Sequence, residues 1–89
     1  MKVSVQKLFE KDVSNIIDKK LATQLNKLIE DLEKAQSLSE IKHVEKMKAK
    51  GNYYRIRLGA YRVGIKAEGD RITLLRFLLR KEIYRNFPP

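Results

Sequence analysis

The apolar positions of this chain change their period between residues 36 and 52. In the first half they recur at the helical spacings i, i+4, i+7, i+8 and i+11, a series made of Leu21, Leu25, Leu28, Ile29 and Leu32. This pattern predicts an amphipathic helix over 20–36. A weaker helical pattern covers 8–18, and the short connection between the two indicates an antiparallel pair of helices.

The second half alternates between apolar and polar residues, which predicts strands. Alternation covers 52–58 and 61–67, and tight Gly-containing turns follow both segments. Residues 71–79 are almost continuously apolar, so we expect a strand that is buried on much of both faces. A shorter alternation over 1–7 predicts a first strand.

Two connecting segments carry weaker signals. Ser37 with Glu40 three residues later is a capping box, which predicts one or two helical turns from Leu38 to about Lys46. A Lys-rich loop should follow over 47–52. Residues 80–87 could add one helical turn before the chain ends in two prolines.

These elements predict a single α+β domain over 1–89, with two N-terminal helices packed on an antiparallel sheet in the order β-α-α-β-β-β. The expected core consists of Leu25, Leu28, Leu32, Ile56, Leu58, Val63, Ile65 and Leu74. Because side chains alternate along a strand, Arg55 and Arg57 should emerge on the face that the helices leave open. Alternation also places Leu79 on the same side of its strand as Thr73, Leu75 and Phe77.

The net charge of +9 lies entirely in the second half of the chain. Residues 1–40 carry seven Lys and seven Asp or Glu, whereas residues 41–89 carry thirteen Lys or Arg and four Asp or Glu, and every arginine is among the thirteen. Such a segregated surplus indicates a polyanionic partner. The alternative is a basic surface that only keeps the protein in solution.

The sequence contains none of the common motifs for metal binding, cofactor binding or a catalytic triad. The chain has no cysteine, no metal-ligand cluster, no Gly-rich phosphate loop and no Ser/His/Asp set, so we expect no metal and no cofactor. Its one histidine, His43, reads as a surface residue rather than a catalyst. No apolar run is long enough to span a membrane and no signal peptide is visible, so we expect a cytoplasmic protein without a membrane partner.

The residues left for chemistry are arginines and one tyrosine: Arg55, Arg57, Arg62, Arg76, Arg80 and Tyr84. Arginines can neutralise a phosphate whose charge rises in the transition state, and a phenol beside them could move a proton. RNA supplies its own nucleophile, the 2′-hydroxyl, so no metal is required. The plainer interpretation is that the arginines only bind phosphate and that Tyr84 packs or stacks.

The segments Tyr54–Gly59, Tyr61–Val63 and Arg76–Arg85, with their Tyr-Arg-Ile-Arg, Tyr-Arg and Arg-Lys-Glu-Ile-Tyr-Arg spacings, resemble the RelE/ParE superfamily of toxins. The resemblance extends weakly over the whole chain and favours the RelE branch. It implies a toxin of a type II toxin–antitoxin pair that enters the ribosome and cleaves mRNA. The implied partners are an acidic antitoxin, the ribosome and mRNA.

Site residues carry over from this resemblance. Arg55 and Arg57 match basic strand positions that contact the scissile region, and Arg62 matches a phosphate-stabilising arginine. Arg80 and Tyr84 match a C-terminal arginine and tyrosine implicated in proton transfer and phosphate stabilisation. The catalytic residues that the resemblance implies are therefore Arg57, Arg62, Arg80 and Tyr84. The remaining basic residues that we expect to bind RNA are Lys46, Lys48, Lys50, Arg76, Lys81 and Arg85.

Two departures from the family pattern matter. Some members have lysines where this chain has Arg55 and Arg57, and an arginine is a poor base. Either Tyr84 is then the proton acceptor, or catalysis rests mainly on positioning and charge. Leu79 stands where relatives often have histidine, so the chain could be a weakened toxin. Leu79 could equally be the last apolar residue of a buried strand. A ParE-like gyrase inhibitor that catalyses nothing, or a small RNA-binding module, remains the alternative function.

Overall fold

The computed structural model describes residues 1–16, 18–48 and 51–88. Its strands are β1 (Lys2–Val5), β2 (Val44–Lys46), β3 (Tyr53–Leu58), β4 (Tyr61–Glu68) and β5 (Arg71–Leu79). Its helices are α1 (Lys7–Ser14), α2 (Lys19–Lys34), the 3₁₀ turn η1 (Leu38–Glu40) and α3 (Arg80–Asn86). The predicted α+β class and element order are confirmed; the helical turn expected over 80–87 forms α3, and β2 is an additional strand.

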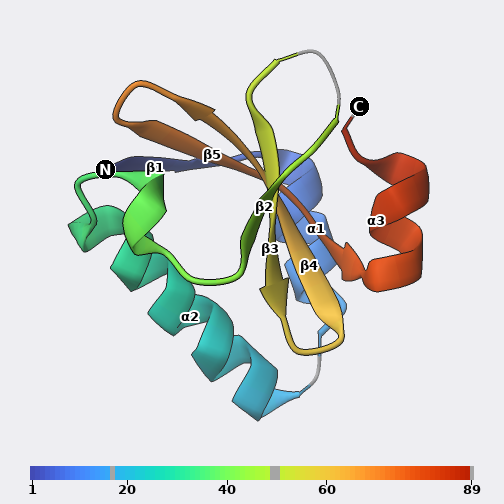
Figure 1. Ribbon diagram of the computed structural model, residues 1–89. Helices are drawn as coiled ribbons and strands as arrows, with labels where there is room; N and C mark the ends of the chain where they lie inside the picture. Colours follow the sequence, from blue (N-terminus) through green and yellow to red (C-terminus); the bar gives the residue numbers. More distant parts are fainter. Residues whose placement is uncertain (17, 49–50, 89) are drawn as a thin grey trace.

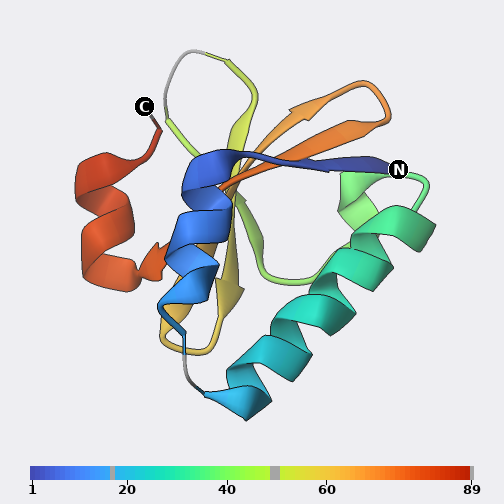
Figure 2. The same cartoon turned by 180° about the vertical axis from the view of Figure 1, so that it is seen from behind.

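The five strands form one sheet in the order β1-β5-β4-β3-β2. β1 pairs in parallel with β5, and all other neighbours are antiparallel. In Figure 1 α1 lies behind the strands, and the strands separate α2 from α3; Figure 2 shows the same arrangement from behind. We call the face covered by α1 and α2 the inner face and the opposite face, on which α3 packs, the outer face.

The main core lies between the inner face and the two long helices. Leu21, Leu25, Leu28 and Leu32 of α2 pack against Ile56, Val63, Ile65, Ile72 and Leu74 of the sheet, with Phe9 and Phe77 completing the cluster. Seven of the eight expected core residues are buried, whereas Leu58 is only half-buried. The helical period before residue 36 and the alternation after residue 52 therefore identify most of the core.

The first helix ends earlier than predicted, at Ser14 rather than residue 18. The cause is Asp18, whose carboxylate accepts hydrogen bonds from the backbone N–H groups of Lys20 and Leu21 and so begins α2. Residue 17, which was predicted to be helical, lies outside the described residues.

The predicted helical turns from Leu38 to Lys46 are wrong in their second half. The capping box of Ser37 and Glu40 is present, but it holds only the short turn η1. Val44–Lys46 instead forms β2, because it pairs with β3 through Val44 opposite Ile56. Long-range pairing to β3 overrides the local helix signal.

The predicted alternation along β5 also fails. The register passes from Ile65 opposite Leu74 to Gly64 opposite Arg76, so Leu75 is an extra residue in β5. This bulge sends both Leu74 and Phe77 into the inner core. Leu79 is 41% exposed, so the interpretation of Leu79 as a buried core residue is wrong.

The helix α3 packs on the outer face through a glycine. Ile83 and Phe87 are buried there, outside the main core cluster. A Cβ added to Gly64 would lie 2.8 Å from the Phe87 ring, so only glycine leaves room for that ring. Tyr53 meets the same ring edge-on at 5.7 Å. This packing places the opposite side of α3 beside the arginines of the sheet.

Candidate nucleic-acid interface and active site

The outer face of β3 and β4 presents a group of arginines. Arg55 and Arg57 alternate with the buried Ile56, and Arg57 lies directly opposite Arg62 in the register of the two strands. Neither Arg55 nor Arg57 lies beneath α1 or α2, as the alternation predicts. The guanidinium of Arg62 is held by the carbonyl oxygens of Gly59 and Tyr61, at 3.0 and 2.8 Å.

The first turns of α3 add Arg80 and Tyr84 to this group. The two residues are four apart on a helix that buries Ile83, so they share a side of it. The Arg55 guanidinium lies over the Tyr84 ring at 4.4 Å from its centre, and that of Arg80 lies at 6.0 Å. Tyr84 is therefore bracketed by two guanidinium groups.

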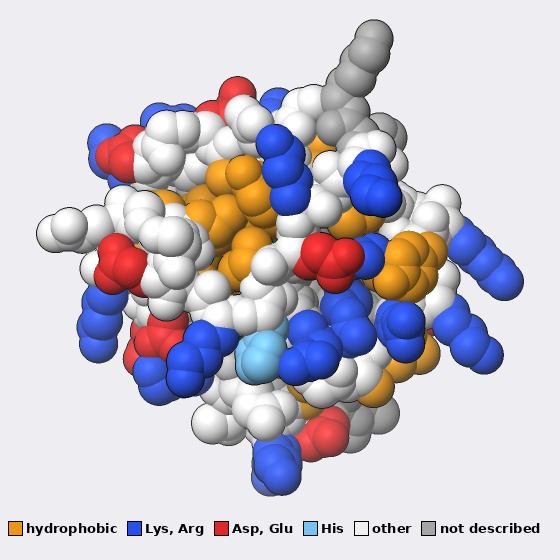
Figure 3. Space-filling model, viewed as in Figure 1, with side chains coloured by type: hydrophobic (Ala, Val, Ile, Leu, Met, Phe, Trp, Pro, Cys, Tyr) orange, Lys and Arg blue, Asp and Glu red, His pale blue; other side chains and the backbone are white. Residues whose placement is uncertain are grey.

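These side chains surround a hollow of about 450 Å³, which we call the cationic hollow. Its lining consists of His43, Val44, Glu45, Arg55, Arg57, Arg62, Arg80 and Tyr84. In Figure 3 the histidine side chain, in pale blue, lies directly beside the blue Lys and Arg side chains that gather on this side of the molecule.

The positive charge that lines the hollow affects the pKa values of two of its groups. Burial lowers the pKa of the Arg62 guanidinium, and the like charges of Arg80 and Arg57 lower it further. The pKa of Glu45 is lowered because its carboxylate accepts hydrogen bonds from Arg55, at 2.7 Å for the shorter one, and feels the charges of Arg62 and Arg80. One carboxylate cannot neutralise four guanidinium groups, so the hollow suits an anion such as a phosphate.

The structure brings together five of the expected site residues. Arg57, Arg62, Arg80 and Tyr84, which the resemblance marks as catalytic, all line the cationic hollow together with Arg55. Tyr84 is 53% exposed, so one part of its ring is open to solvent. The five residues come from three different elements, β3, β4 and α3.

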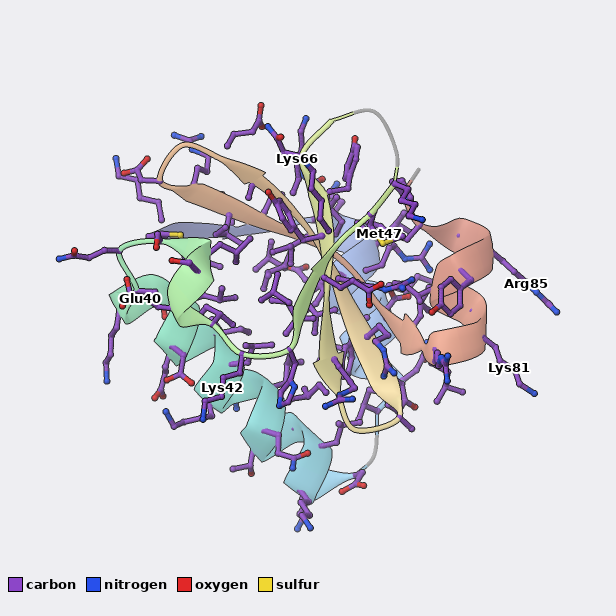
Figure 4. All side chains as sticks on the ribbon, viewed as in Figure 1. Glu40, Lys42, Met47, Lys66, Lys81 and Arg85 are labelled. Carbon is purple, nitrogen blue, oxygen red and sulfur yellow. The ribbon has the colours of Figure 1, made fainter. Side chains whose placement is uncertain are left out.

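The other basic residues expected to bind RNA do not line the hollow wherever the structure describes them. Lys46 and Lys48 are exposed in and after β2, and Lys50 lies outside the described residues. Lys81 and Arg85 point outward from α3, away from the sheet (Figure 4). These exposed cations could contact the parts of a polyanion that extend beyond the hollow, but not a phosphate within it.

Arg76 has a structural contact instead. Its guanidinium makes two hydrogen bonds to Asp12 of α1, at 2.8 and 3.1 Å. The hydrogen bonds that Arg76 donates to the Asp12 carboxylate raise the pKa of Arg76. The same carboxylate accepts the backbone N–H of Phe77 at 2.9 Å, where β5 continues beyond the end of β1. Arg76 thus fixes α1 to an open strand edge and is not available to RNA in this arrangement.

Sequence reasoning missed three residues of the hollow, the apolar Val44 and the polar pair His43 and Glu45. Glu45 and His43 reach the hollow because the chain around them, which was predicted to be helical, instead forms β2 and pairs with β3. The Nδ1 atom of His43 lies 3.0 Å from Nη2 of Arg57. The Lys-Gly loop after β2 could have indicated a hairpin with β3, but it carries no information about its register.

Neither a metal-binding group nor a membrane-spanning helix is found in the part of the chain that the structure describes. It holds no group of three or more His, Cys, Asp or Glu side chains arranged to bind a metal ion. Nor does any helix in these residues have the length and apolar character needed to cross a membrane.

The comparisons with known proteins agree with this geometry. Residues 3–84 match the family described as ParE toxin of type II toxin-antitoxin system, parDE. The chain is 40% identical to Toxin RelE3 of Methanocaldococcus jannaschii over 89 residues, 99% of this chain and 100% of that protein.

Solved structures show the same fold. A chain of the RelB-RelE antitoxin-toxin complex from Methanococcus jannaschii matches with a TM-score of 0.81 and 36% identity, covering 96% of this chain and 99% of that one. A chain of the RelE-RelB complex from Pyrococcus horikoshii OT3 matches with a TM-score of 0.73 and 25% identity, covering 89% and 93%. This chain therefore belongs to the RelE/ParE superfamily, as a RelE-like toxin of a type II toxin–antitoxin system.

Proposed function

We propose that this toxin is a ribosome-dependent mRNA endonuclease that acts in the cytoplasm and cleaves without a metal ion. The observation that carries the proposal is the convergence of Arg55, Arg57, Arg62 and Arg80 with Tyr84 around one hollow. Four guanidinium groups and a phenol fit a reaction in which charge builds on a phosphate and a proton moves.

The chemistry follows from these groups. The 2′-hydroxyl of the RNA attacks the adjacent phosphorus and the bond to the 5′-oxygen breaks, which leaves a 2′,3′-cyclic phosphate and a 5′-hydroxyl. Arg62 is the best-placed group for the phosphate, because the carbonyls of Gly59 and Tyr61 hold it and it shares the hollow with Arg57 and Arg80. A guanidinium that is already oriented needs little rearrangement as charge develops.

Leu79 bears on the strength of this activity. It precedes Arg80 but does not line the hollow, and leucine can neither move a proton nor bond a phosphate. If relatives place an imidazole there, this chain lacks that contribution and is a weaker toxin.

The test is a translation assay that maps new mRNA 5′ ends with ribosomes present and absent. New ends should form only with ribosomes, and they should be lost when Arg62 is replaced by glutamine. Arg71→Gln removes the same charge from the exposed start of β5, outside the hollow, so it should leave cleavage intact. Equal cleavage of free mRNA would contradict ribosome dependence.

A second candidate is inhibition of DNA gyrase, because the matching family model is described by its ParE toxins. This function would use the basic face for binding alone. A supercoiling assay with purified gyrase separates the two: inhibition without any mRNA cleavage would favour the gyrase target.

We also propose an acidic antitoxin as the partner that silences the protein. Relatives from M. jannaschii and P. horikoshii were solved as complexes of RelE with RelB. A surplus of arginines on one face favours an anionic segment as the neutralising surface. The affinity for the antitoxin encoded beside this gene should fall as salt rises, whereas an affinity that ignores ionic strength would contradict this account.

A further inference from the structure

His43 occupies an unusual backbone position at the edge of the cationic hollow. Its φ is 63°, the only positive φ at a residue other than glycine in the described part of the chain. Its carbonyl oxygen accepts the backbone N–H of Arg57 at 3.1 Å, so the strained residue is fixed against β3. Strained non-glycine residues persist where the surrounding structure holds them, and they are common at functional sites.

The side chain of His43 is oriented by the same arginine. Nδ1 lies 3.0 Å from Nη2 of Arg57. A guanidinium can only donate, so Nδ1 is the acceptor and the neutral ring carries its proton on Nε2. Arg57 thus holds a neutral imidazole at the edge of the hollow. The lone pair of Nδ1 points at the Arg57 guanidinium, and a bound phosphate would attract the same guanidinium.

No other group of the hollow can readily take a proton from a hydroxyl. The arginines are acids only, and the Glu45 carboxylate is already engaged by Arg55 at 2.7 Å. The Tyr84 phenol, which the sequence suggested as the proton acceptor, carries a proton of its own and must lose it before it can accept one, so it suits the role of proton donor. His43 also lines a second hollow, between α2 and the start of β2. The charged and titratable groups of the two hollows are Lys27, Asp31, Lys34, Glu40, Lys42, Glu45, Arg55, Arg57, Arg62, Arg80 and Tyr84.

From this geometry we infer that His43 is a catalytic residue, the general base of the cleavage; this rests on the proposed function. Arg57 exchanges Nδ1 for a phosphate oxygen when RNA binds, and the freed Nδ1 accepts the proton of the 2′-hydroxyl. The 2′-oxygen forms its bond to phosphorus, the bond from phosphorus to the 5′-oxygen breaks, and the 5′-oxygen takes a proton from the Tyr84 hydroxyl. Exchange with water restores both side chains.

Two substitutions separate proton transfer from a structural role. His43→Gly suits a φ of 63° and leaves a space that free imidazole can enter. His43→Asn also tolerates this backbone, but it fills part of the space and cannot accept the proton. Both variants should keep the melting temperature and the ribosome affinity of the unchanged protein.

The experiment measures single-turnover cleavage of a defined mRNA on programmed ribosomes, with and without added imidazole. Both variants should cleave about 10²–10³-fold more slowly than the unchanged protein. Added imidazole should raise the cleavage rate of His43→Gly roughly tenfold or more and leave the rate of His43→Asn unchanged.

Each other outcome overturns a stated part of the account. An active unchanged protein with an equally active His43→Gly would overturn the role of His43 alone. A loss that imidazole does not restore would show that His43 only orients Arg57. An unchanged protein that cleaves no mRNA would overturn the proposed function itself, and this inference with it.

Discussion

The two faces of the sheet are built by different means. The inner face is closed by α2, whose four buried leucines meet a continuous apolar surface, and the fully buried Leu32 and Ile65 lie within this core. The outer face is held only by the short helix α3, through Ile83 and by Phe87 against Gly64. Stability therefore resides mainly on one face, and the groups available for chemistry gather on the other.

This separation lets the site carry unbalanced charge. Four guanidinium groups around one hollow repel one another; burial lowers the pKa of Arg62 most, and the like charges of Arg80 and Arg57 lower it further. A large apolar core on the opposite face can offset that cost, since each buried leucine or isoleucine contributes about 1.5–3 kcal/mol. Substitutions on the two faces should consequently affect different measurements.

The largest effect should come from Arg62. Arg62→Gln should slow mRNA cleavage by about 10²–10⁴-fold, because it removes an oriented charge from the phosphate. Its free energy of unfolding should change little or rise, since repulsion by Arg57 and Arg80 is relieved. Single-turnover cleavage and urea denaturation measure the two quantities. A large loss of stability would show that Arg62 supports the fold.

The matching change on the inner face is Leu32→Ala. Leu32 is fully buried, so its truncation should lower the free energy of unfolding by about 3–5 kcal/mol through lost burial and a cavity. Urea denaturation measures this loss. In the fraction that remains folded, cleavage should be close to that of the unchanged protein, and a selective loss of cleavage would contradict the division between the faces.

The contact that holds α3 should behave as a coupled pair. Gly64→Ala places a methyl group 2.8 Å from the Phe87 ring and should cost about 1–3 kcal/mol. Phe87→Leu gives the methyl group room, so the double variant should be more stable than the sum of the single effects predicts. Denaturation of the four proteins completes the cycle. Strict additivity would show that α3 is not seated on Gly64.

The outer face should also make binding sensitive to salt. If about five phosphates are contacted, the logarithm of the affinity for ribosomes should fall with the logarithm of salt at a slope of about −3 to −5. Replacing Lys48 and Lys50 together should weaken binding while leaving the cleavage step nearly unchanged. A slope near zero would place the charge outside the interface.

The sequence predicted the inner face better than the outer one, for a physical reason. Helical period and strand alternation report which side chains avoid water, and that information is local. The residues that complete the hollow depend on long-range pairing: His43 and Glu45 reach it because β2 pairs with β3. The bulge at Leu75 also depends on the pairing of β5 with β4, so the sequence of β5 alone does not reveal it.

Position 79 should show the smallest effect on stability. Leu79 is 41% exposed, so Leu79→His should change the free energy of unfolding by less than about 0.5 kcal/mol. We expect the added imidazole to raise ribosome-dependent cleavage about tenfold, because residue 79 adjoins Arg80. Thermal denaturation and single-turnover cleavage measure the two effects. An unchanged rate would show that a side chain at this position does not reach the phosphate.

The central claim is that the outer face cleaves RNA by means of the RNA's own 2′-hydroxyl. The most direct test is an mRNA that carries a single 2′-deoxynucleotide immediately 5′ of a mapped cut, compared on ribosomes with the all-ribose mRNA of the same sequence. The account predicts that cleavage at that bond disappears while the protein still binds the ribosome, and that the all-ribose fragment ends in a 2′,3′-cyclic phosphate. Unchanged cleavage of the deoxy-substituted bond would contradict it.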